Sequence, residues 1–337
     1  MMRIAITADP FIPVPPMNYG GIERVICMLA EGLKALGHDV ILVAHKDSII
    51  NIELIKYPSI SNQCIGTAKN LNAINELKKW EPDLIHSFSR MAYLLPFLRS
   101  KMPKLMSYQR VPTISQIKKA LSFAKKDTLT FTGCSNYISN QISEYGTTHT
   151  VYNGVDLSKY KFIDVIKKDA PMVFLGRIEP IKGAHNAIRA AQTTGKKLVI
   201  AGNIPKEYQY YYDQQIKPYL NDRISYIGEV NDQQKSELLG SAALFLMPIE
   251  WNEPFGIVMA EALACGTPVI GYSKGAVSEI VEHGINGYLA NSFEELCGHI
   301  NKYTSISRYA AMESAKERFS SSKIVSDYLN IYQSLLK

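Results

Sequence analysis

Residues 251–270 read WNEPFGIVMAEALACGTPVI, and this stretch decides the fold. Pro254 suits the first turn of an α-helix, because proline lacks an N–H that such a turn leaves unused. Apolar runs flank the stretch at 243–247 and 268–271, and each has the length of a buried strand. A strand, a helix and a second strand in this order predict a parallel sheet covered by helices.

The same alternation extends in both directions. In the second half, we expect a helix at 184–193 and strands at 172–175, 198–201 and 225–227. In the first half, we expect a helix at 22–36 and strands at 3–8, 40–44, 84–86 and 129–134. The chain therefore predicts two copies of a doubly wound α/β architecture, joined near the turn dipeptide Asn153-Gly154. A length of 337 residues agrees with two domains, since single cores stop growing at roughly 250–300 residues.

The composition is that of an ordinary globular protein, with 46% hydrophobic and 20% charged residues. The five cysteines are far apart and form no CxxC pair, which argues against a disulfide framework or a structural zinc site. The N-terminus runs directly into a strand pattern without a long apolar segment, and no apolar run is long enough to span a membrane. We therefore expect a cytoplasmic protein.

Positive charge is concentrated in the first half. Residues 1–150 hold 17 Lys and Arg against 11 Asp and Glu, whereas the remainder holds 20 of each. No acid occurs between Asp83 and Asp127, a stretch that carries Arg90, Arg99, Lys101, Lys104, Arg110, Lys118, Lys119, Lys125 and Lys126. Two interpretations stay open for residues 90–126: a solvated face, or a surface for an anionic acceptor or an anionic membrane. No helix-turn-helix or RNA-binding motif accompanies the charge, so nucleic acid is not an expected partner.

Two groups of residues follow strands at positions where a parallel sheet binds ligands. Gly20 and Gly21 open a helix, where backbone N–H groups can approach a phosphate, although a flexible loop would also explain them. Gly176-Arg177 ends a strand, and the loop returns Lys182 toward it. Two cations there suit a diphosphate, and the alternative is a pair of solvated surface cations.

The stretch at 251–270 carries two carboxylates around one helix start. If the helix begins at Pro254, the N–H groups of Phe255 to Ile257 are free to bind phosphate or sugar hydroxyls. Glu253 precedes this helix, and Glu261 lies about 7.5 Å along its axis. Both could be ordinary helix-end charges. Glu261, however, is surrounded by apolar residues, and a lone carboxylate there is costly without a partner. This favours a functional role.

These motifs together resemble those of the retaining GT-B glycosyltransferases of family 4, over almost the whole chain. The resemblance rests on four stretches: GGIERV (20–25), YNGVD (152–156), GRIEPIKG (176–183) and the pair Glu253 and Glu261, with the spacing Glu-x7-Glu. It implies a GT-B fold, in which two Rossmann-like doubly wound domains face each other across a cleft. Residues 1–152 and about 320–337 would form the acceptor-side domain, and 153–319 the donor domain. The final helix would thus cross back to the first domain.

The resemblance also implies roles for single residues. Arg177, Lys182 and Glu253 would be catalytic: the two cations would hold the donor diphosphate, and the carboxylate would hold the transferred sugar. Glu261 would hold the ribose, and the backbone around Gly228, Glu229 and Val230 would frame the base. The other residues expected to contact the donor are Gly20, Gly21, Gly176, Phe255, Gly256 and Ile257.

One position departs from the family pattern on the acceptor side. Many relatives have a histidine after the strand near 104–108, where this chain has Gln109, which cannot exchange a proton near neutral pH. This departure predicts a different donor sugar or subfamily, or reduced activity. The acceptor-side candidates are His86, Arg90, Gln109 and Arg110. For His86 a structural role is the alternative, since a lone histidine after a strand is more often structural.

The sequence therefore predicts a retaining transfer of sugar from a UDP- or GDP-sugar to a saccharide, lipid-linked or small-molecule acceptor. We expect no cofactor beyond the donor and no metal, because no Asp-x-Asp occurs in the chain. Two alternatives stay open: a GT-B sugar-nucleotide epimerase, and a non-catalytic sugar-nucleotide-binding protein.

Overall fold

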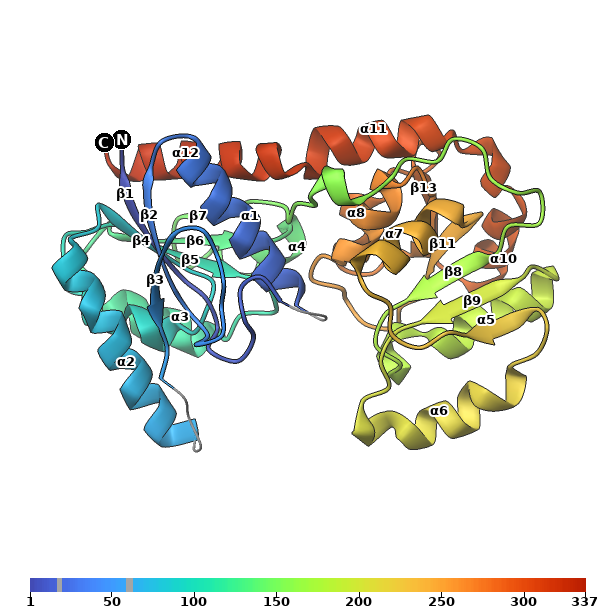
Figure 1. The fold of residues 1–337 in the computed structure, drawn as a ribbon, viewed down its shortest axis with the longest axis horizontal. Helices are drawn as coiled ribbons and strands as arrows, with labels where there is room; N and C mark the ends of the chain where they lie inside the picture. The colour runs from blue at the N-terminus through green and yellow to red at the C-terminus, as the bar shows by residue number, and fades with distance from the viewer. Residues whose placement is uncertain (17–19, 59–62) are drawn as a thin grey trace. The chain divides into compact units, whose positions relative to one another are not determined.

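The computed structural model describes residues 1–16, 20–58 and 63–337, and they divide into two compact units (Figure 1). The first unit comprises Met1–Asn153 and Ser321–Lys337, and the second comprises Gly154–Ser320. The boundaries expected from sequence differ from these by one residue.

The first unit is built on a parallel sheet with the strand order β3-β2-β1-β4-β5-β6-β7. Its strands are β1 (Arg3–Thr7), β2 (Asp39–Ala44), β3 (Glu53–Lys56), β4 (Leu84–Ser87), β5 (Lys104–Tyr108), β6 (Leu129–Gly133) and β7 (Thr148–Thr150). Its helices are α1 (Gly21–Ala35), α2 (Gln63–Trp80), the 3₁₀ helix η1 (Met91–Phe97), α3 (Ile114–Phe123), α4 (Asn136–Ser139) and α12 (Ser321–Leu335).

The second unit repeats this plan with the strand order β10-β9-β8-β11-β12-β13, again parallel throughout. Its strands are β8 (Met172–Leu175), β9 (Leu198–Ala201), β10 (Ile224–Tyr226), β11 (Leu244–Met247), β12 (Val269–Tyr272) and β13 (Gly287–Ala290). Its α-helices are α5 (Ala184–Thr194), α6 (Gln209–Gln215), α7 (Asp232–Ser241), α8 (Ile257–Ala264), α9 (Val277–Ile280), α10 (Phe293–Asn301) and α11 (Arg308–Phe319). Short 3₁₀ helices are η2 (Leu157–Lys159), η3 (Pro180–Lys182), η4 (Lys206–Tyr208), η5 (Lys217–Tyr219) and η6 (Tyr303–Ser305).

Helices cover both faces of each sheet, which explains why the central strands are apolar on both sides (Figure 1). In β1, Ile4, Ala5 and Ile6 are completely buried. On one face of this sheet α1 packs against α12, where the side chain of Val325 lies so close to Gly32 that a Cβ there would overlap it. The chain thus ends on the unit in which it began.

The strand order fixes where each unit can bind a ligand. In both sheets the order reverses beside the first strand, between β1 and β4 in the first unit and between β8 and β11 in the second. At such a switch point the loops after the two strands diverge, and a crevice opens at the carboxyl ends. The loops after β1, β4, β8 and β11 are therefore the loops to examine.

One predicted helix start was wrong. Helix α8 begins at Ile257 and not at Pro254, because Gly256 has a left-handed φ of 79° and ends the preceding loop. Glu261 therefore lies four residues after the first helical residue, near the middle of this short helix.

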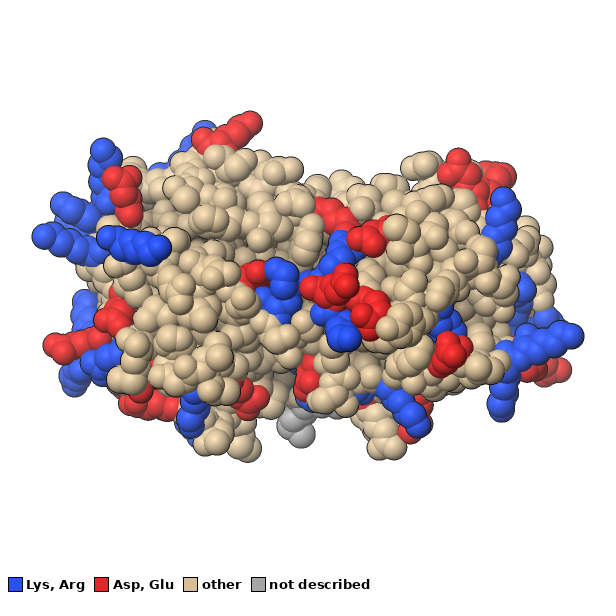
Figure 2. All heavy atoms as spheres, turned by 90° about the horizontal axis from the view of Figure 1, so that it is seen from above, with Lys and Arg blue, Asp and Glu red and all other residues tan. Residues whose placement is uncertain are grey.

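The basic stretch at 90–126 does not form one exposed set. Lys104 is completely buried, and its ammonium donates to the carbonyl oxygens of Phe97, Leu98 and Ser100, at 3.1, 3.3 and 2.8 Å. The expectation that it belongs to a surface was wrong. Arg99, Lys118 and Lys126 are exposed. On the face drawn in Figure 2, basic and acidic side chains are interspersed. Within the described residues, no helix has both the length and the apolar character needed to cross a bilayer.

Candidate functional site

Three side chains meet at the switch point of the second unit. Lys182 lies at the end of η3, after β8, and Trp251 and Glu253 lie in the loop after β11. The Lys182 ammonium donates to Glu253 Oε2 at 2.8 Å, and Trp251 Nε1 donates to the same oxygen at 3.0 Å. The ammonium also lies 4.7 Å from the centre of the Trp251 ring. Among the described residues, Glu253 Oε1 has no hydrogen bond, so one carboxylate oxygen is held and the other is available.

The backbone of Glu253 is fixed by the turn that follows β12. Its carbonyl oxygen accepts a hydrogen bond from the N–H of Ala276 at 2.8 Å. Gly275 has a left-handed φ of 59°, and a Cβ there would lie 2.5 Å from the Glu253 carbonyl oxygen and 2.6 Å from its nitrogen. Only glycine fits this approach without displacement. The position of Glu253 thus depends on contacts to the loops that follow β8 and β12.

Arg177 follows β8 on the same edge and is paired with a neighbouring acid. Its Nη2 lies 2.9 Å from Oε1 of Glu179, whose side chain is buried. Its Nε is buried and donates no hydrogen bond to any described residue. This donor therefore suits an anionic ligand.

Glu261 is buried in α8 and has partners from two distant segments. Its Oε1 accepts a hydrogen bond from the Tyr160 hydroxyl at 2.5 Å and another from the Lys235 ammonium at 2.5 Å. Its Oε2 is buried and has no hydrogen-bond partner among the described residues. Glu261 thus repeats the arrangement of Glu253, because donors hold one oxygen and leave the second to a ligand.

The other residues expected to contact the donor lie on neighbouring loops. The first-turn N–H groups of α8, at Ile257 and Val258, have no acceptor within the helix. The Phe255 ring is buried and stacks edge-on against Phe319, with centroids 5.8 Å apart, so it serves the core. Gly256, which has a left-handed φ, forms the turn between Phe255 and the first residue of α8, Ile257.

Three glycines connect the loops after β8, β9 and β10. The N–H of Gly202 donates to the carbonyl oxygen of Gly228 at 2.8 Å, and the N–H of Gly176 donates to that of Ala201 at 3.1 Å. Beyond them Glu229 is exposed and Val230 is half-buried. These hydrogen bonds join the three loops along one edge of the sheet, next to Arg177.

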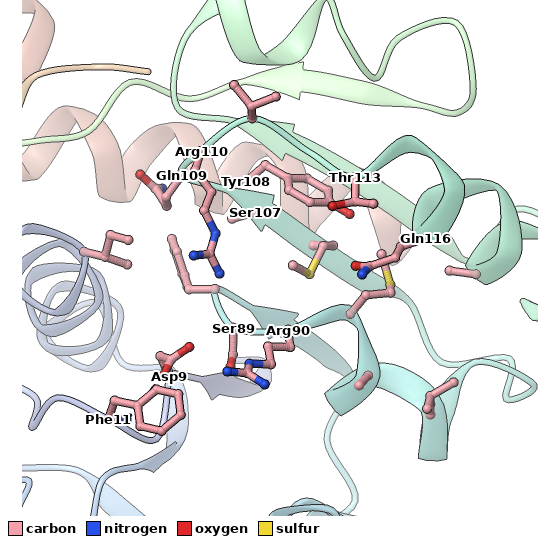
Figure 3. Close-up of a pocket in the computed structure, with 18 of the residues that line it drawn as sticks. Asp9, Phe11, Ser89, Arg90, Ser107, Tyr108, Gln109, Arg110, Thr113 and Gln116 are labelled. Carbon is pink, nitrogen blue, oxygen red and sulfur yellow. Dashed lines mark hydrogen bonds between the residues drawn. The ribbon is translucent and has the colours of Figure 1, made fainter. Parts of the chain in front are cut away.

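The first unit contains a pocket of about 880 Å³ at its own switch point (Figure 3). Its lining comes from the loop after β1, the loop after β4 with η1, the end of β5, and α3. Figure 3 shows Arg110 directed toward Arg90 and Ser89, with Asp9 beside them and Thr113 and Gln116 on the other side. The charged residues that line the pocket are Asp9, Glu23, Arg90, Arg110 and Lys119.

Three of the four acceptor-side candidates line this pocket. Arg90 lies over the Phe11 ring, 5.4 Å from its centre, and Arg110 is exposed. Gln109 accepts a hydrogen bond from Asn153 at 2.7 Å through Oε1, and its Nε2 is buried without a partner among the described residues. Gln109 is therefore fixed by one end of its amide.

The fourth candidate, His86, is not at the pocket. It is completely buried on β4, where Nδ1 lies 2.6 Å from the Tyr332 hydroxyl and Nε2 lies 2.6 Å from Ser107 Oγ. Burial lowers the pKa of the ring to about 3, so it is neutral at physiological pH. The expectation that His86 contacts an acceptor was wrong, because the returning helix α12 covers it.

Gly20 and Gly21 begin α1, and Gly20 has a φ of 151°. The first turn also holds Glu23, which is 5% exposed and lines the pocket. Burial raises the pKa of the Glu23 carboxyl, and the nearby Asp9 contributes in the same direction. A phosphate at this helix start would thus have a carboxyl group as its neighbour.

Sequence reasoning missed several of these partners. Trp251 lies inside the stretch that decides the fold, and its indole N–H beside Glu253 could have drawn attention to it. Tyr160 and Lys235 have no local signal, since they reach Glu261 only through the fold. No three His, Cys, Asp or Glu side chains in the described part of the chain are placed to hold a metal ion together.

Comparisons with known proteins concern the family of the chain. Two family models match the chain: "Glycosyltransferase Family 4" over residues 19–159 and "Glycosyl transferases group 1" over residues 158–318. "Spore coat protein SA" of Bacillus subtilis (strain 168) is 23% identical, over 98% of this chain and 99% of its own length.

Solved structures show the same fold. AviGT4, described as a glycosyltransferase involved in avilamycin A biosynthesis, superposes with a TM-score of 0.74 at 23% identity, over 100% of this chain and 98% of its own. Anabaena Alr3699/HepE, solved in complex with UDP and glucose, gives a TM-score of 0.77 at 20% identity, over 99% and 100%. With matching models over both halves and this fold throughout, the chain belongs to the family 4 glycosyltransferases of GT-B fold.

Proposed function

We propose that this glycosyltransferase moves a sugar from a nucleoside-diphosphate donor, a UDP- or GDP-sugar, with retention of anomeric configuration. The second unit binds the donor and the first unit binds the acceptor. Arg177 and Lys182 bind the diphosphate. Glu253 binds the transferred sugar, and Glu261 binds the ribose. No metal and no further cofactor takes part.

The observation that carries the proposal is the shared state of the two carboxylates. Both residues are buried, and donors hold one oxygen of each carboxylate. The other oxygen of Glu261 is itself buried and has no hydrogen bond from a described residue. A buried carboxylate oxygen without a donor is costly, so a ligand hydroxyl there is strongly favoured. Sugars and ribose present such hydroxyls, and cations lie on the same edge for the phosphates between them.

The chemistry follows from these positions. The bond between the anomeric carbon and the phosphate oxygen breaks, and negative charge develops on the departing phosphate. Lys182 and Arg177 stabilise this charge, together with the N–H groups of the first turn of α8. The acceptor oxygen bonds to the anomeric carbon on the face that the phosphate leaves, and its proton passes to the departing phosphate oxygen. This route gives retention without a protein nucleophile.

Thermal unfolding in the presence of nucleotides tests the donor site. The purified chain is mixed with UDP, GDP, ADP, dTDP and their sugars, each with EDTA and without added metal. A nucleotide at 100 times its dissociation constant stabilises the fold by about 2.7 kcal/mol. We expect a clear rise in Tm with one nucleotide, unchanged by EDTA. If no nucleotide raises Tm, the Arg177–Lys182–Glu261 arrangement is not a donor site.

Product analysis then separates the transferase from its alternatives. With the stabilising donor and a panel of acceptors, we expect a glycoside whose anomeric proton has the configuration of the donor. An epimerised sugar formed from the donor alone would indicate the epimerase. Binding of the donor without turnover over the whole panel would indicate a non-catalytic binding protein.

A peripheral contact with an anionic membrane, through the exposed cations of 90–126, completes the proposal. Lys118, Lys119, Lys125 and Lys126 are all exposed and lie on or beside α3. Exchanging these four for glutamine should reduce sedimentation with phosphatidylserine vesicles. Equal sedimentation of the variant would leave only the solvated-face interpretation.

A further inference from the structure

The pocket of the first unit is large and has an apolar part. Its volume of about 880 Å³ lies toward the upper end of the range of small-molecule sites, ~300–1,000 Å³. Met91 and Leu98, from η1 and the turn after it, and Met106 of β5 supply apolar side chains. Ala120 and Phe123 supply more from α3.

Exposed apolar side chains gather around this pocket. Phe11, Leu95, Val111 and Phe123 are 56%, 54%, 50% and 47% exposed, and all four line it. Apolar side chains that cluster around a concave site mark the binding of an apolar group. A fully hydrophilic saccharide would leave these side chains in contact with water or with hydroxyls.

Two guanidinium groups also belong to the lining, and that of Arg90 lies over the Phe11 ring. Arg90 and Arg110 both line the pocket, and Figure 3 shows the two side chains on the side of the pocket where Asp9 lies. Neither forms an ion pair with a carboxylate among the described residues. Arginine binds phosphate and carboxylate groups through paired N–H donors. The pocket thus combines an anion-binding end with an apolar wall.

Two carboxyl groups, those of Asp9 and Glu23, share the lining with three cations. Burial raises the pKa of both Asp9 and Glu23, and Lys119 adds a third cation to the two arginines. Asp9 can accept a hydrogen bond from a hydroxyl of the bound molecule. Ser89 Oγ and Gln109 Nε2, which have no partner among the described residues, lie in the same lining.

We propose that the acceptor is an anionic amphiphile, whose phosphate or carboxylate group binds between Arg90 and Arg110 and whose apolar body lies against η1 and α3. This inference rests on the proposed function, because it takes the pocket as the acceptor site. Among saccharide, lipid-linked and small-molecule acceptors, it favours those that are amphiphilic and anionic. It disfavours neutral, fully hydrophilic saccharides.

Titration calorimetry without donor tests the inference on the full chain. The probes are octyl phosphate, octanol and inorganic phosphate, each below its aggregation limit. We expect octyl phosphate to bind at least about tenfold more tightly than either fragment, because only it engages both parts of the pocket. Equal affinity for inorganic phosphate would mean a free-anion site, and equal affinity for octanol a purely apolar one. Either result, or no binding at all, overturns the proposal.

Matched variants locate the binding. Arg110→Gln should raise the dissociation constant of octyl phosphate about tenfold, because a charge-assisted hydrogen bond is lost. Arg99→Gln, exposed and outside the lining, should leave the affinity unchanged. Leu95→Asp should also weaken binding, and Ile49→Asp, at another exposed apolar position, should not. Equal effects of variant and control in either pair contradict the proposal.

These outcomes are independent of the donor site. The Tm of each variant checks its fold, and Arg110 and Leu95 are exposed enough to be replaced without unfolding the unit. Nucleotide stabilisation is measured separately. A chain that binds nucleotides but not octyl phosphate contradicts this inference alone, and the reverse result contradicts the proposed donor site alone.

Discussion

Lys182 Nζ and Glu253 Oε2 lie 2.8 Å apart, so the cation proposed for the diphosphate is paired with the carboxylate proposed for the sugar. Both side chains are largely buried, with 19% and 10% of their surface exposed. A buried ion pair is maintained when each charge compensates the other. An incoming phosphate would supply a second anion to the ammonium, which has three donors and can serve both.

Lys182→Ala should lower kcat by about 10²–10³, since the loss of one donor to a developing oxyanion has an effect of that size. Steady-state kinetics at saturating donor measures this. Lys196→Ala, at the amino end of β9 and therefore away from the ligand edge, is the matched control and should retain kcat. An unchanged kcat in Lys182→Ala would remove the residue from the proposed mechanism.

Glu253→Gln should separate catalysis from nucleotide binding. The carboxylate is proposed to hold the transferred sugar, and it contacts none of the groups proposed for the base or ribose. We expect kcat to fall at least about tenfold, the usual effect of losing a hydrogen bond to a charged group. The rise in Tm caused by the bare nucleoside diphosphate should persist. Glu250→Gln, three residues earlier on the same loop, is the control, and equal losses in both variants would contradict the assignment.

Lys235→Met should weaken donor binding, although the ammonium is not proposed to touch the donor. Its removal leaves Glu261 Oε1 with the Tyr160 hydroxyl alone and frees the carboxylate to rotate. We expect the dissociation constant of the nucleotide to rise about tenfold, as for the loss of one charge-assisted hydrogen bond. Titration calorimetry of this variant measures the dissociation constant. The control is Lys316→Met, which removes the exposed ion pair between Lys316 and Glu313. If the Lys235→Met and Lys316→Met variants both bind the nucleotide with the wild-type dissociation constant, Lys235 does not position Glu261.

The architecture could be predicted from sequence because strand and helix periodicity is local. The strand at 172–175 and the strand at 198–201 have the predicted bounds, and α1 and α5 lie within one residue of theirs. The ion pair between Glu253 and Lys182 was not predicted, although both residues follow strands that are neighbours at a switch point.

The partners of Glu261 could not be predicted, because no local pattern encodes them. Tyr160 is 101 residues away in the chain and Lys235 is 26 residues away. The predicted start of α8 was wrong for a different reason. Pro254 is compatible with a helix start, but Gly256 has a left-handed φ, so the helix begins only after it. The φ of a glycine cannot be predicted from sequence, because glycine adopts positive and negative φ about equally well.

Gly275→Ala should both destabilise the protein and impair catalysis. The left-handed backbone conformation costs an L-residue roughly 1–2 kcal/mol, and the added Cβ would overlap the Glu253 backbone. Gly284 has a similar φ, 82°, but nothing lies within 4 Å of its Cβ position. Gly284→Ala should therefore lower Tm through backbone strain and retain kcat, whereas Gly275→Ala should lower both. Equal kcat values in the two variants would show that this turn does not position Glu253.

His86 should make the stability of the protein depend on pH. Its pKa is about 3 in the folded chain because burial disfavours the charged ring, whereas an unfolded histidine has a pKa of about 6.5. Above pH 6.5 the ring is neutral in both states and contributes no pH dependence. Below it the unfolded chain binds a proton that the folded chain does not bind, so the free energy of unfolding falls as the pH falls toward 3. At pH 5 the loss from this residue should be about 2 kcal/mol.

Denaturant unfolding of His86→Gln between pH 7.5 and pH 4.5 measures this contribution. Glutamine keeps hydrogen-bonding groups near Ser107 and Tyr332 but takes up no proton. We expect the variant to be less stable than the wild type at pH 7.5, because the ring also packs 4.2 Å from Phe88, and to lose less stability on acidification. Parallel curves for wild type and His86→Gln would mean that the buried ring gains a proton in the folded protein, and the tight contacts around both of its nitrogens would then have to open.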